Sequence, residues 1–176
     1  VSFVSLGCAK NTVDSECLLG NLARAGLVLA EDPADADVCL VNTCGFIHDA
    51  REEAADVLRE LSELKQDGQL KAIVAMGCLV ERAAEWPDFA EFLRHADRRI
   101  SFADYPRLPE ICRALAQGST ESRESAAPAS SFMEFLNSPR LRIGGMHSAY
   151  LKLSEGCSNL CRFCSIPLIR GRQVSR

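Results

Sequence analysis

The sequence predicts an α/β fold, a doubly wound parallel sheet, and three observations favour it. Short apolar runs that end in small or turn-forming residues recur through residues 1–116, and stretches with the apolar spacing of a helix lie between them. The expected strands are nearly continuous in apolar residues, as parallel strands covered on both faces are. Strands and helices that alternate in this way favour a parallel sheet with helices on both sides.

Short strands and longer helices are expected to follow one another along this domain. The expected strands are residues 1–6, 27–30, 38–41, 72–76 and 99–102. The expected helices are residues 12–25, 49–65, 80–96 with a break at Pro87, and 108–116.

The first expected helix has a recognisable start. Asn11 or Thr12 is the expected cap, because a side-chain oxygen there can accept from the first free amide groups. Asp14 and Glu16 fall in the predicted first turn, where carboxylates stabilise the positive end of the helix dipole. The second expected helix carries its apolar residues on one face and ends near residues 67–68.

A change of composition divides the chain into three parts. Residues 1–117 are the predicted doubly wound domain, and residues 118–138, rich in Ser, Ala, Glu and Pro, are a predicted linker. Residues 139–176 hold an expected strand at 149–153 and then a cysteine-rich loop. A strand and a loop cannot bury a core by themselves, so we expect them to open a second domain whose remainder is absent.

Composition and charge restrict the class of protein. The chain has 176 residues, of which 47% are hydrophobic and 25% charged, which is ordinary for a soluble globular protein and excludes full disorder. No apolar run approaches the roughly 20 residues of a membrane helix, and the start lacks a signal-peptide pattern, so we expect no membrane association and a cytoplasmic location.

Charge is distributed unevenly along the chain. Residues 1–138 carry 13 Lys and Arg against 23 Asp and Glu, a net charge of −10, whereas residues 139–176 carry 7 against 1, a net charge of +6. The acidic part is a poor match for a phosphate backbone. The basic part either meets an anionic cofactor, nucleic acid or acidic protein, or forms a solvated or domain-facing surface.

Cysteine is the most informative residue type. The chain has nine cysteines, an odd number, which argues against a closed disulfide framework. In a reducing compartment, ligation of a metal or a cluster is the better explanation for so many thiols.

Three of the cysteines stand close together in the segment EGCSNLCRFC. Cys157, Cys161 and Cys164 are spaced so that three thiolates of one short loop can converge on one iron-sulfur centre. Three ligands leave one iron of a cubane without a protein thiolate, and a small molecule could bind there. The alternatives are chance clustering and a zinc site, but zinc needs a fourth ligand and His147 is poorly placed for that role.

Three other cysteines each follow an expected strand. Cys8, Cys44 and Cys78 come just after the carboxyl ends of strands that are expected to be parallel, and such ends share the edge of a sheet where ligands bind. The sequence therefore predicts a second three-thiolate site, with adjoining glycines that allow tight turns. The remaining cysteines lie on apolar faces and are expected in the core, where thiols behave as small hydrophobes. They are Cys17, Cys39 and Cys112.

Four segments, SLGCAKNTVDSE, VNTCGFI, MGCL and YLKLSEGCSNLCRFCSIP, resemble in this order the methylthiotransferases of the radical S-adenosylmethionine superfamily. The resemblance covers nearly the whole chain. It implies an amino-terminal domain with three separated cysteines, followed by the first strand and cluster loop of a radical S-adenosylmethionine barrel. Members of the family also carry a small carboxyl-terminal domain of an RNA-binding type.

The resemblance implies two [4Fe-4S] clusters. Cys8, Cys44 and Cys78 would hold the auxiliary cluster. A second cluster, on the other set of three cysteines, would bind S-adenosylmethionine through its open iron and, when reduced, split the C–S bond of that cofactor to give methionine and a 5′-deoxyadenosyl radical. Phe163 fits the aromatic residue that precedes the last cysteine of the superfamily loop and is the expected cofactor-binding side chain. No catalytic residue beyond the cluster ligands is implied.

Within the family, GCAKNTVDSE, NTCGFI and SEGC are closer to the RimO type, which modifies a ribosomal protein, than to the MiaB type, which modifies tRNA. Ala9 is a departure, because RimO-like sequences often have Pro at this position. The implied reaction replaces a C–H bond at the β carbon of an aspartate in a small-subunit ribosomal protein by C–S–CH3. The radical removes the hydrogen, sulfur at the auxiliary cluster traps the carbon radical, and a second S-adenosylmethionine supplies the methyl group.

The implied partners are the ribosomal protein substrate and an electron donor such as flavodoxin or ferredoxin, and we expect a monomer that is inactive as this part alone. The alternatives are a tRNA adenosine methylthiotransferase and a non-catalytic iron-sulfur carrier. Asn11 and Asn42 are either donors to the auxiliary site or capping and turn residues. Arg170 and Arg172 either contact cofactor or substrate or lie in a solvated loop.

Overall fold

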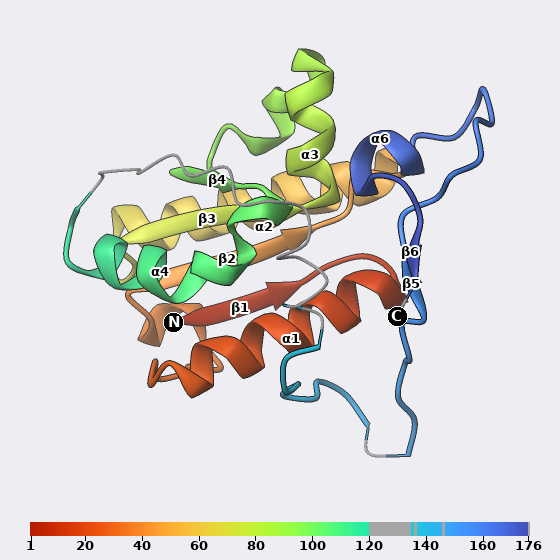
Figure 1. Ribbon diagram of the computed structural model, residues 1–176. Helices are drawn as coiled ribbons and strands as arrows, with labels where there is room; N and C mark the ends of the chain where they lie inside the picture. The colour runs from red at the N-terminus through yellow and green to blue at the C-terminus, as the bar shows by residue number, and fades with distance from the viewer. Residues whose placement is uncertain (120–134, 136, 146, 176) are drawn as a thin grey trace.

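Figure 1 shows the protein as a computed structural model that describes residues 1–119, 135, 137–145 and 147–175. Most of the expected linker, residues 118–138, lies outside these described residues. The strands are β1 (Ser2–Ser5), β2 (Val38–Thr43), β3 (Ala72–Gly77), β4 (Arg98–Ile100), β5 (Ser154–Glu155) and β6 (Val174–Ser175). The helices are α1 (Ala9–Arg24), η1 (Pro33–Asp35), α2 (His48–Gln66), α3 (Cys78–Glu85), η2 (Pro87–Leu93), η3 (Phe102–Arg107), α4 (Leu108–Ala116) and α6 (Ile166–Arg170).

A parallel sheet of β1, β2, β3 and β4, in that order, forms the centre of the molecule. Alternate residues of β2 face opposite sides, so Leu40 packs with α1 and α4 whereas Cys39 and Val41 pack with α2, α3 and η2. Both faces are therefore covered, as Figure 1 shows. The predicted α/β class and the covered parallel sheet are confirmed.

The strand expected at residues 27–30 is wrong as a regular strand, but the segment follows the edge of β1. The amino group of Val1 donates to the Val28 carbonyl at 2.8 Å, and the Ala30 amide donates to the Val1 carbonyl at 2.9 Å. These bonds have the pattern of a parallel ladder. They lie on the side of β1 away from β2, because Leu6, five positions later, points its amide toward Asn42.

Residues 27–30 and β2 thus flank β1 on opposite sides. The chain leaves β1 through α1 toward one edge and then returns to the other side at β2. In a doubly wound sheet, ligands bind in the crevice beyond the carboxyl ends of the strands, and here the ends of β1 and β2 lie side by side. Cys8 and Cys44 follow the two strands that meet there.

The first helix begins earlier than the sequence predicts. Helix α1 starts at Ala9 with Cys8 as its cap, so the expected cap at Asn11 or Thr12 is wrong. Asp14 and Glu16 consequently lie beyond the first turn, and both are buried. Their carboxylates are satisfied by cations from residues 139–175 instead of by the helix dipole.

The other helices follow the prediction closely. Helix α4 matches residues 108–116, and the helix expected at 80–96 is divided at Pro87 into α3 and η2, as predicted. Proline is tolerated there because it opens η2, where its missing amide is not needed. No helix in the described part of the chain is both long and apolar enough to cross a membrane.

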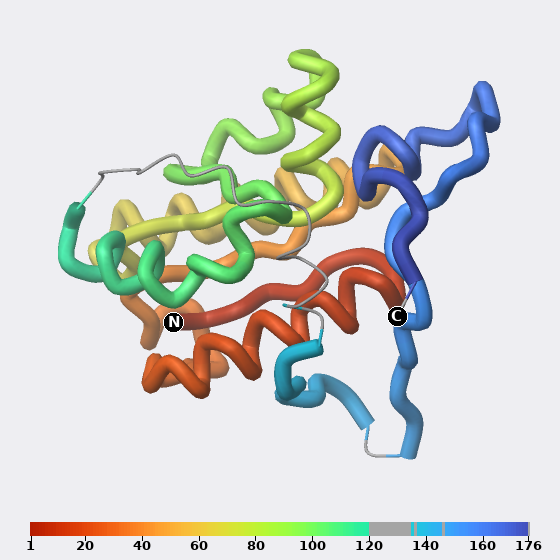
Figure 2. The backbone as a smooth tube through the Cα atoms, viewed as in Figure 1, coloured from red at the N-terminus to blue at the C-terminus, as the bar shows by residue number. Residues whose placement is uncertain are grey.

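The strand expected at residues 149–153 is wrong. Backbone in this range is irregular, and only the two-residue β5 follows it, paired antiparallel with β6. The apolar side chains that suggested a buried strand, Tyr150, Leu151 and Leu153, are exposed, because no neighbouring strand among the described residues covers them. Figure 2 shows this carboxyl-terminal segment running past the start of α1, at the end of the sheet where the strands terminate.

Candidate functional site

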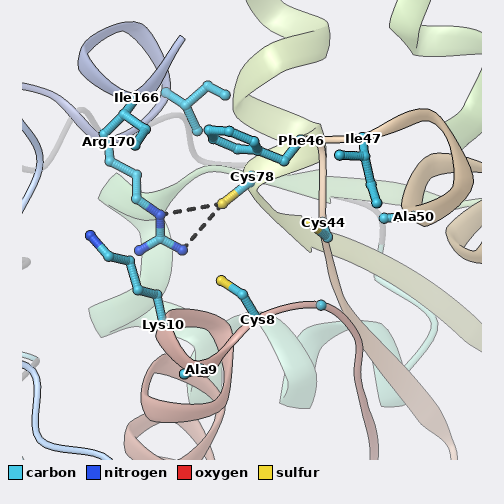
Figure 3. A pocket seen from close by; sticks show the side chains of 12 residues that line it. Cys8, Ala9, Lys10, Cys44, Phe46, Ile47, Ala50, Cys78, Ile166 and Arg170 are labelled. Atoms are coloured by element: carbon cyan, nitrogen blue, oxygen red, sulfur yellow. Dashed lines mark hydrogen bonds between the residues drawn. The ribbon is translucent and has the colours of Figure 1, made fainter. Parts of the chain in front are cut away.

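A cavity of about 650 Å³ lies at the carboxyl ends of the strands, and three cysteines line it. Cys8, Cys44 and Cys78, which are far apart in sequence, meet there as the order of the strands requires. Figure 3 shows the sulfur atoms of Cys8 and Cys78 pointing toward one another across this space. The rest of the lining is mainly apolar and includes Phe46 and Ile166.

Each of these cysteines is placed by the junction between a strand and the following segment. Cys8 is the cap of α1 and is exposed, Cys44 follows β2 directly, and Cys78 is the first residue of α3. Gly7 lets the first junction pass close to the second: a Cβ atom at Gly7 would lie 2.7 Å from the Cβ of Cys44. Its φ of +92° also favours glycine.

The three thiols form a donor set that suits a soft metal. No His, Asp or Glu is among the described residues that line the cavity, so hard cations that prefer oxygen find no charged ligand there. The three sulfur atoms are not all within 4.8 Å of one another; among the described residues, only the exposed His48, Asp49 and Glu52 have three potential ligand atoms that close together. Thiolates on a single ion lie at most about 4.6 Å apart. A spacing wider than this suits a group larger than a single ion, and cysteine thiolates are the ligands that hold iron-sulfur clusters.

Burial keeps Cys78 neutral when no metal is bound. Removal from water raises the pKa of its thiol to about 11, although the nearby Arg170 guanidinium acts in the opposite direction. A metal that binds Cys78 must therefore displace a proton.

Arg170 reaches the same site from the carboxyl-terminal segment. Its Nε and Nη2 groups donate to the Cys78 sulfur at 3.3 and 3.2 Å, and Nη2 also donates to Oδ1 of Asn11 at 2.8 Å. Its Nη1 group donates to Asp14 at 2.9 Å and to both oxygens of Glu155 at 3.1 Å. The guanidinium thus bridges a sulfur and two carboxylates, and the expectation of a solvated loop is wrong for Arg170.

Arg170 forms a buried group of four charges with Lys152, Asp14 and Glu155. Lys152 donates to Asp14 and, at 2.6 Å, to Glu155, and all four side chains are at most 7% exposed. Burial raises the pKa of Glu155, but Arg170 and Lys152 outweigh burial and hold that pKa below its usual value. The group is electrically neutral and joins α1 to β5 and α6.

A second connection lies further along α1. Glu16 accepts from Nε of Arg140 at 3.0 Å and from the Ile143 amide at 3.2 Å, and its backbone carbonyl accepts from the Leu141 amide at 3.0 Å. Residues 140–143 are therefore fastened to the helix through one carboxylate and one carbonyl.

Cys157, Cys161 and Cys164 lie in the loop between β5 and α6. Cys161 is exposed, and the other two are partly exposed. The Cys164 amide donates to the Cys161 carbonyl at 3.1 Å, and the Cys157 amide donates to the Gly171 carbonyl at the same distance. These bonds shape the loop without bringing its three sulfurs within 4.8 Å of one another. Phe163 is 94% exposed and is not among the described residues that line the cavity.

The asparagines near the site act mainly as backbone supports. Asn11 donates from Nδ2 to the carbonyls of Leu6 and Thr43 and so ties the ends of β1 and β2 together. Asn42 donates to the Asn11 carbonyl and to Ser15. Both asparagines therefore act as turn and capping residues and not as donors to the thiols of the site. Oδ1 of Asn11 also accepts from Arg170.

Sequence reasoning missed the residues that join the two segments. The sequence pattern places Asp14 and Glu16 at a helix end and indicates no role for Lys152 or Glu155. One feature of the sequence does point to them. Asp14 stands one turn before the core residue Leu18 and so on the buried face of α1. An unpaired carboxylate is costly there, so a cation is expected as its partner. The expected core cysteines, in contrast, are confirmed as fully buried: Cys17, Cys39 and Cys112.

The chain matches one protein family and is similar to several proteins that share one name. Residues 1–95 match a family described as "Uncharacterized protein family UPF0004". A protein of Anaeromyxobacter sp. (strain Fw109-5) named "Ribosomal protein uS12 methylthiotransferase RimO" is 44% identical over 172 residues, which cover 98% of this chain and 35% of that protein. A protein of the same name from Trichlorobacter lovleyi is 44% identical over 176 residues, which cover all of this chain and 38% of that protein. The Geobacter sulfurreducens protein of this name is 40% identical over the same span.

The chain spans little more than a third of the length of these relatives, between 35% and 38%.

Proposed function

This chain belongs to the UPF0004 family and is of the RimO type along its whole length, and on that premise we propose that it acts in the methylthiolation of an aspartate in ribosomal protein uS12. The observation that carries the proposal is the convergence of Cys8, Cys44 and Cys78 on one cavity that has no other metal-binding side chain among its described residues. The position modified would be the β carbon of the aspartate.

We assign Cys8, Cys44 and Cys78 as ligands of an auxiliary [4Fe-4S] cluster, and the cysteines of the β5–α6 loop as ligands of a second cluster. The clusters would supply radical generation from S-adenosylmethionine at the second site and sulfur at the first. Phe163 is the proposed aromatic side chain beside that cofactor, and its exposure leaves it free to make this contact.

The protein's own residues prepare the auxiliary site for such a reaction. The glycine turn before Cys8 brings the backbones of β1 and β2 close together, so that two thiols enter the cavity from neighbouring junctions. Phe46 and Ile166 line the cavity with apolar surface, against which the carbon chain of a substrate can pack. Asn11 and Asn42 hold the strand ends in place by hydrogen bonds to the backbone.

Lys10 favours an acidic substrate. Its side chain lines the cavity and is exposed, and no ion pair of Lys10 occurs among the described residues. Arg170, the other cation of the cavity, is already paired with Asp14 and Glu155. Lys10 is therefore the cation available to a carboxylate, and a carboxylate is directly bonded to the β carbon of aspartate.

The proposed partners follow from this reaction. Reduction of a cluster requires a one-electron donor, for which flavodoxin or ferredoxin is suitable, and the substrate is a ribosomal protein. We propose a cytoplasmic location, which such a substrate and reduced thiolate ligands support. We propose a monomer as the working form.

The test uses the full-length protein, reconstituted anaerobically with iron and sulfide. Roughly eight irons per chain are expected for two clusters. Given S-adenosylmethionine and a reductant, the protein should add a methylthio mass to a uS12 peptide and not to a tRNA anticodon stem-loop. Modification of the RNA alone would overturn the assignment of the substrate, and about four irons without cleavage of S-adenosylmethionine would favour a cluster carrier.

Matched variants test the auxiliary ligands. Cys44→Ala should lose close to half of the bound iron and all methylthio transfer. The control is Cys17→Ala, which removes a buried thiol of the core and should leave the iron content unchanged. Equal iron in both variants would exclude Cys44 as a ligand.

A further inference from the structure

We propose that Arg170 is a positioning residue that sets the reduction potential of the auxiliary cluster and ties it to the segment that carries the second set of cysteines. This inference rests on the proposed function, since it takes Cys78 as a cluster ligand. It is carried by the geometry of the guanidinium, which is 5% exposed.

The guanidinium is oriented by its carboxylate partners. Asp14 and Glu155 hold Nη1 at 2.9 and 3.1 Å. The side chain is planar, so once this end is fixed, the opposite edge with Nε and Nη2 can point in only one direction. Both groups of that edge donate to the Cys78 sulfur, at 3.3 and 3.2 Å.

The need to balance the two carboxylates does not by itself explain why residue 170 is an arginine. Lys152 also contacts both carboxylates, so that a second compact cation in place of Arg170 would complete the same balance. What a lysine lacks is the fork: one ammonium cannot hold two carboxylates on one side and present two parallel donors to a sulfur on the other. The arrangement around Cys78 therefore makes use of a property specific to arginine.

Two donors on a ligand sulfur have a defined electrostatic effect. Reduction adds a negative charge to a cluster, and hydrogen bonds to its sulfurs, together with a nearby positive charge, stabilise the reduced form. The pair of N–H groups from Arg170 should therefore raise the reduction potential of the auxiliary cluster. Substitution of a residue that orients a metal ligand in this way typically weakens the binding of the metal as well.

The same contact links the two sets of cysteines. Arg170 ends α6, which begins just after Cys164, so the loop that holds the second set is followed by the residue that binds Cys78. Arg170 also stacks over Phe102, with 5.1 Å from the guanidinium carbon to the ring centroid. Figure 3 shows the guanidinium beside the Cys78 sulfur at the rim of the cavity.

The experiment isolates the auxiliary cluster in the full-length protein by changing Cys157, Cys161 and Cys164 to Ala. In this background, Arg170→Met is combined with Glu155→Gln, which removes one charge of each sign and leaves Lys152 paired with Asp14. Because no buried charge is then left unpaired, this double variant should fold. Arg170→Lys keeps the charge without the fork, and Arg172→Gln is the control, as Arg172 is exposed in the same segment.

The midpoint potential from a redox titration followed by electron paramagnetic resonance is the main readout. It should move to more negative values in Arg170→Met/Glu155→Gln, lie in between in Arg170→Lys, and stay unchanged in Arg172→Gln. Transfer of iron to a chelator should be about 10- to 100-fold faster in the double variant. A potential equal to that of Arg172→Gln would overturn the proposal, since a purely structural role changes stability but not the potential.

These readouts need neither substrate nor turnover. If the shift in potential occurs but the full-length protein fails to modify a uS12 peptide, the inference about Arg170 holds and the proposed function fails. If the background protein binds no iron at the remaining cysteines, both are overturned.

Discussion

Nη1 of Arg170 donates to Oδ2 of Asp14 at 2.9 Å although 156 positions separate the two residues. Asp14 belongs to the first helix of the sheet domain and Arg170 to the short helix after the second set of cysteines. The pair is buried, and together with the neighbouring ion pairs it holds the carboxyl-terminal segment beside the start of α1 (Figure 2).

The connection through Glu16 should be measurable as stability. Glu16→Gln leaves Arg140 without its carboxylate in a mostly buried position, and breaking such a pair costs about 3 kcal/mol. We expect the free energy of unfolding from urea titration to fall by about this amount. Glu60→Gln, at an exposed position of α2, is the control and should have little effect. A loss of similar size in both variants would contradict the role assigned to Glu16.

Gly7 should be required for the placement of Cys44. Gly7→Ala adds a methyl group that would lie 2.7 Å from the Cβ of Cys44, so we expect lower stability and a loss of the auxiliary iron. Gly26→Ala is a matched control, because Gly26 also has a positive φ, of +79°, but nothing lies within 4 Å of the added atom. Its expected cost is only the backbone strain of about 1 to 2 kcal/mol, with the iron content retained. Equal iron in the two variants would show that close approach at Gly7 is not needed.

Substitution of Lys10 should weaken the reaction with the substrate but leave the clusters unchanged. Lys10→Met removes the cation available to a substrate carboxylate, and we expect kcat/KM for a uS12 peptide to fall roughly tenfold, as for the loss of one charge-assisted hydrogen bond. Iron content and cleavage of S-adenosylmethionine without peptide should be unchanged. Lys10→Arg keeps the charge and should retain most of the activity. An unchanged kcat/KM in Lys10→Met would remove the support for an acidic substrate.

The buried thiol of Cys112 should make stability depend on pH in the alkaline range. Burial raises its pKa to about 12 in the folded protein, whereas the thiol of an unfolded chain has a pKa near 8.5. Between these values the unfolded chain has lost the proton that the folded protein keeps, so stability falls as pH rises, by up to about 1.4 kcal/mol per pH unit. Urea unfolding under reducing conditions at pH 8, 9 and 10 should show a smaller decline in Cys112→Ala than in the unchanged protein. Parallel declines would rule out this thiol as the source.

The sheet and its cysteine edge were predictable because they depend on local patterns. Strand β2 begins with four apolar residues and is buried along its whole length, and Cys44 stands directly after it, so the parallel arrangement determines where the thiol lies. The core position of Cys17 follows from helix periodicity in the same way.

The joining residues could not be predicted, because their partners are distant in sequence. A carboxylate near a helix start has the same local signature whether it faces water or a buried arginine, so the pattern around Asp14 predicts a contact with the helix dipole and not its ion pair with Arg170. The strand expected at 149–153 failed for a related reason: apolar residues such as Leu151 form a strand only when a neighbouring strand supplies hydrogen bonds, and none does so among the described residues.

The four buried charges around Arg170 have a consequence for how the two cysteine-bearing segments separate. Because Lys152 and Arg170 each contact both Asp14 and Glu155, the loss of any one contact leaves every charge with a partner. Only withdrawal of the whole carboxyl-terminal segment, which carries Lys152, Glu155 and Arg170, would leave Asp14 of α1 without a cation. The junction therefore tolerates small displacements but resists separation, and a protein that separates the two segments must offer Asp14 a positive charge of its own.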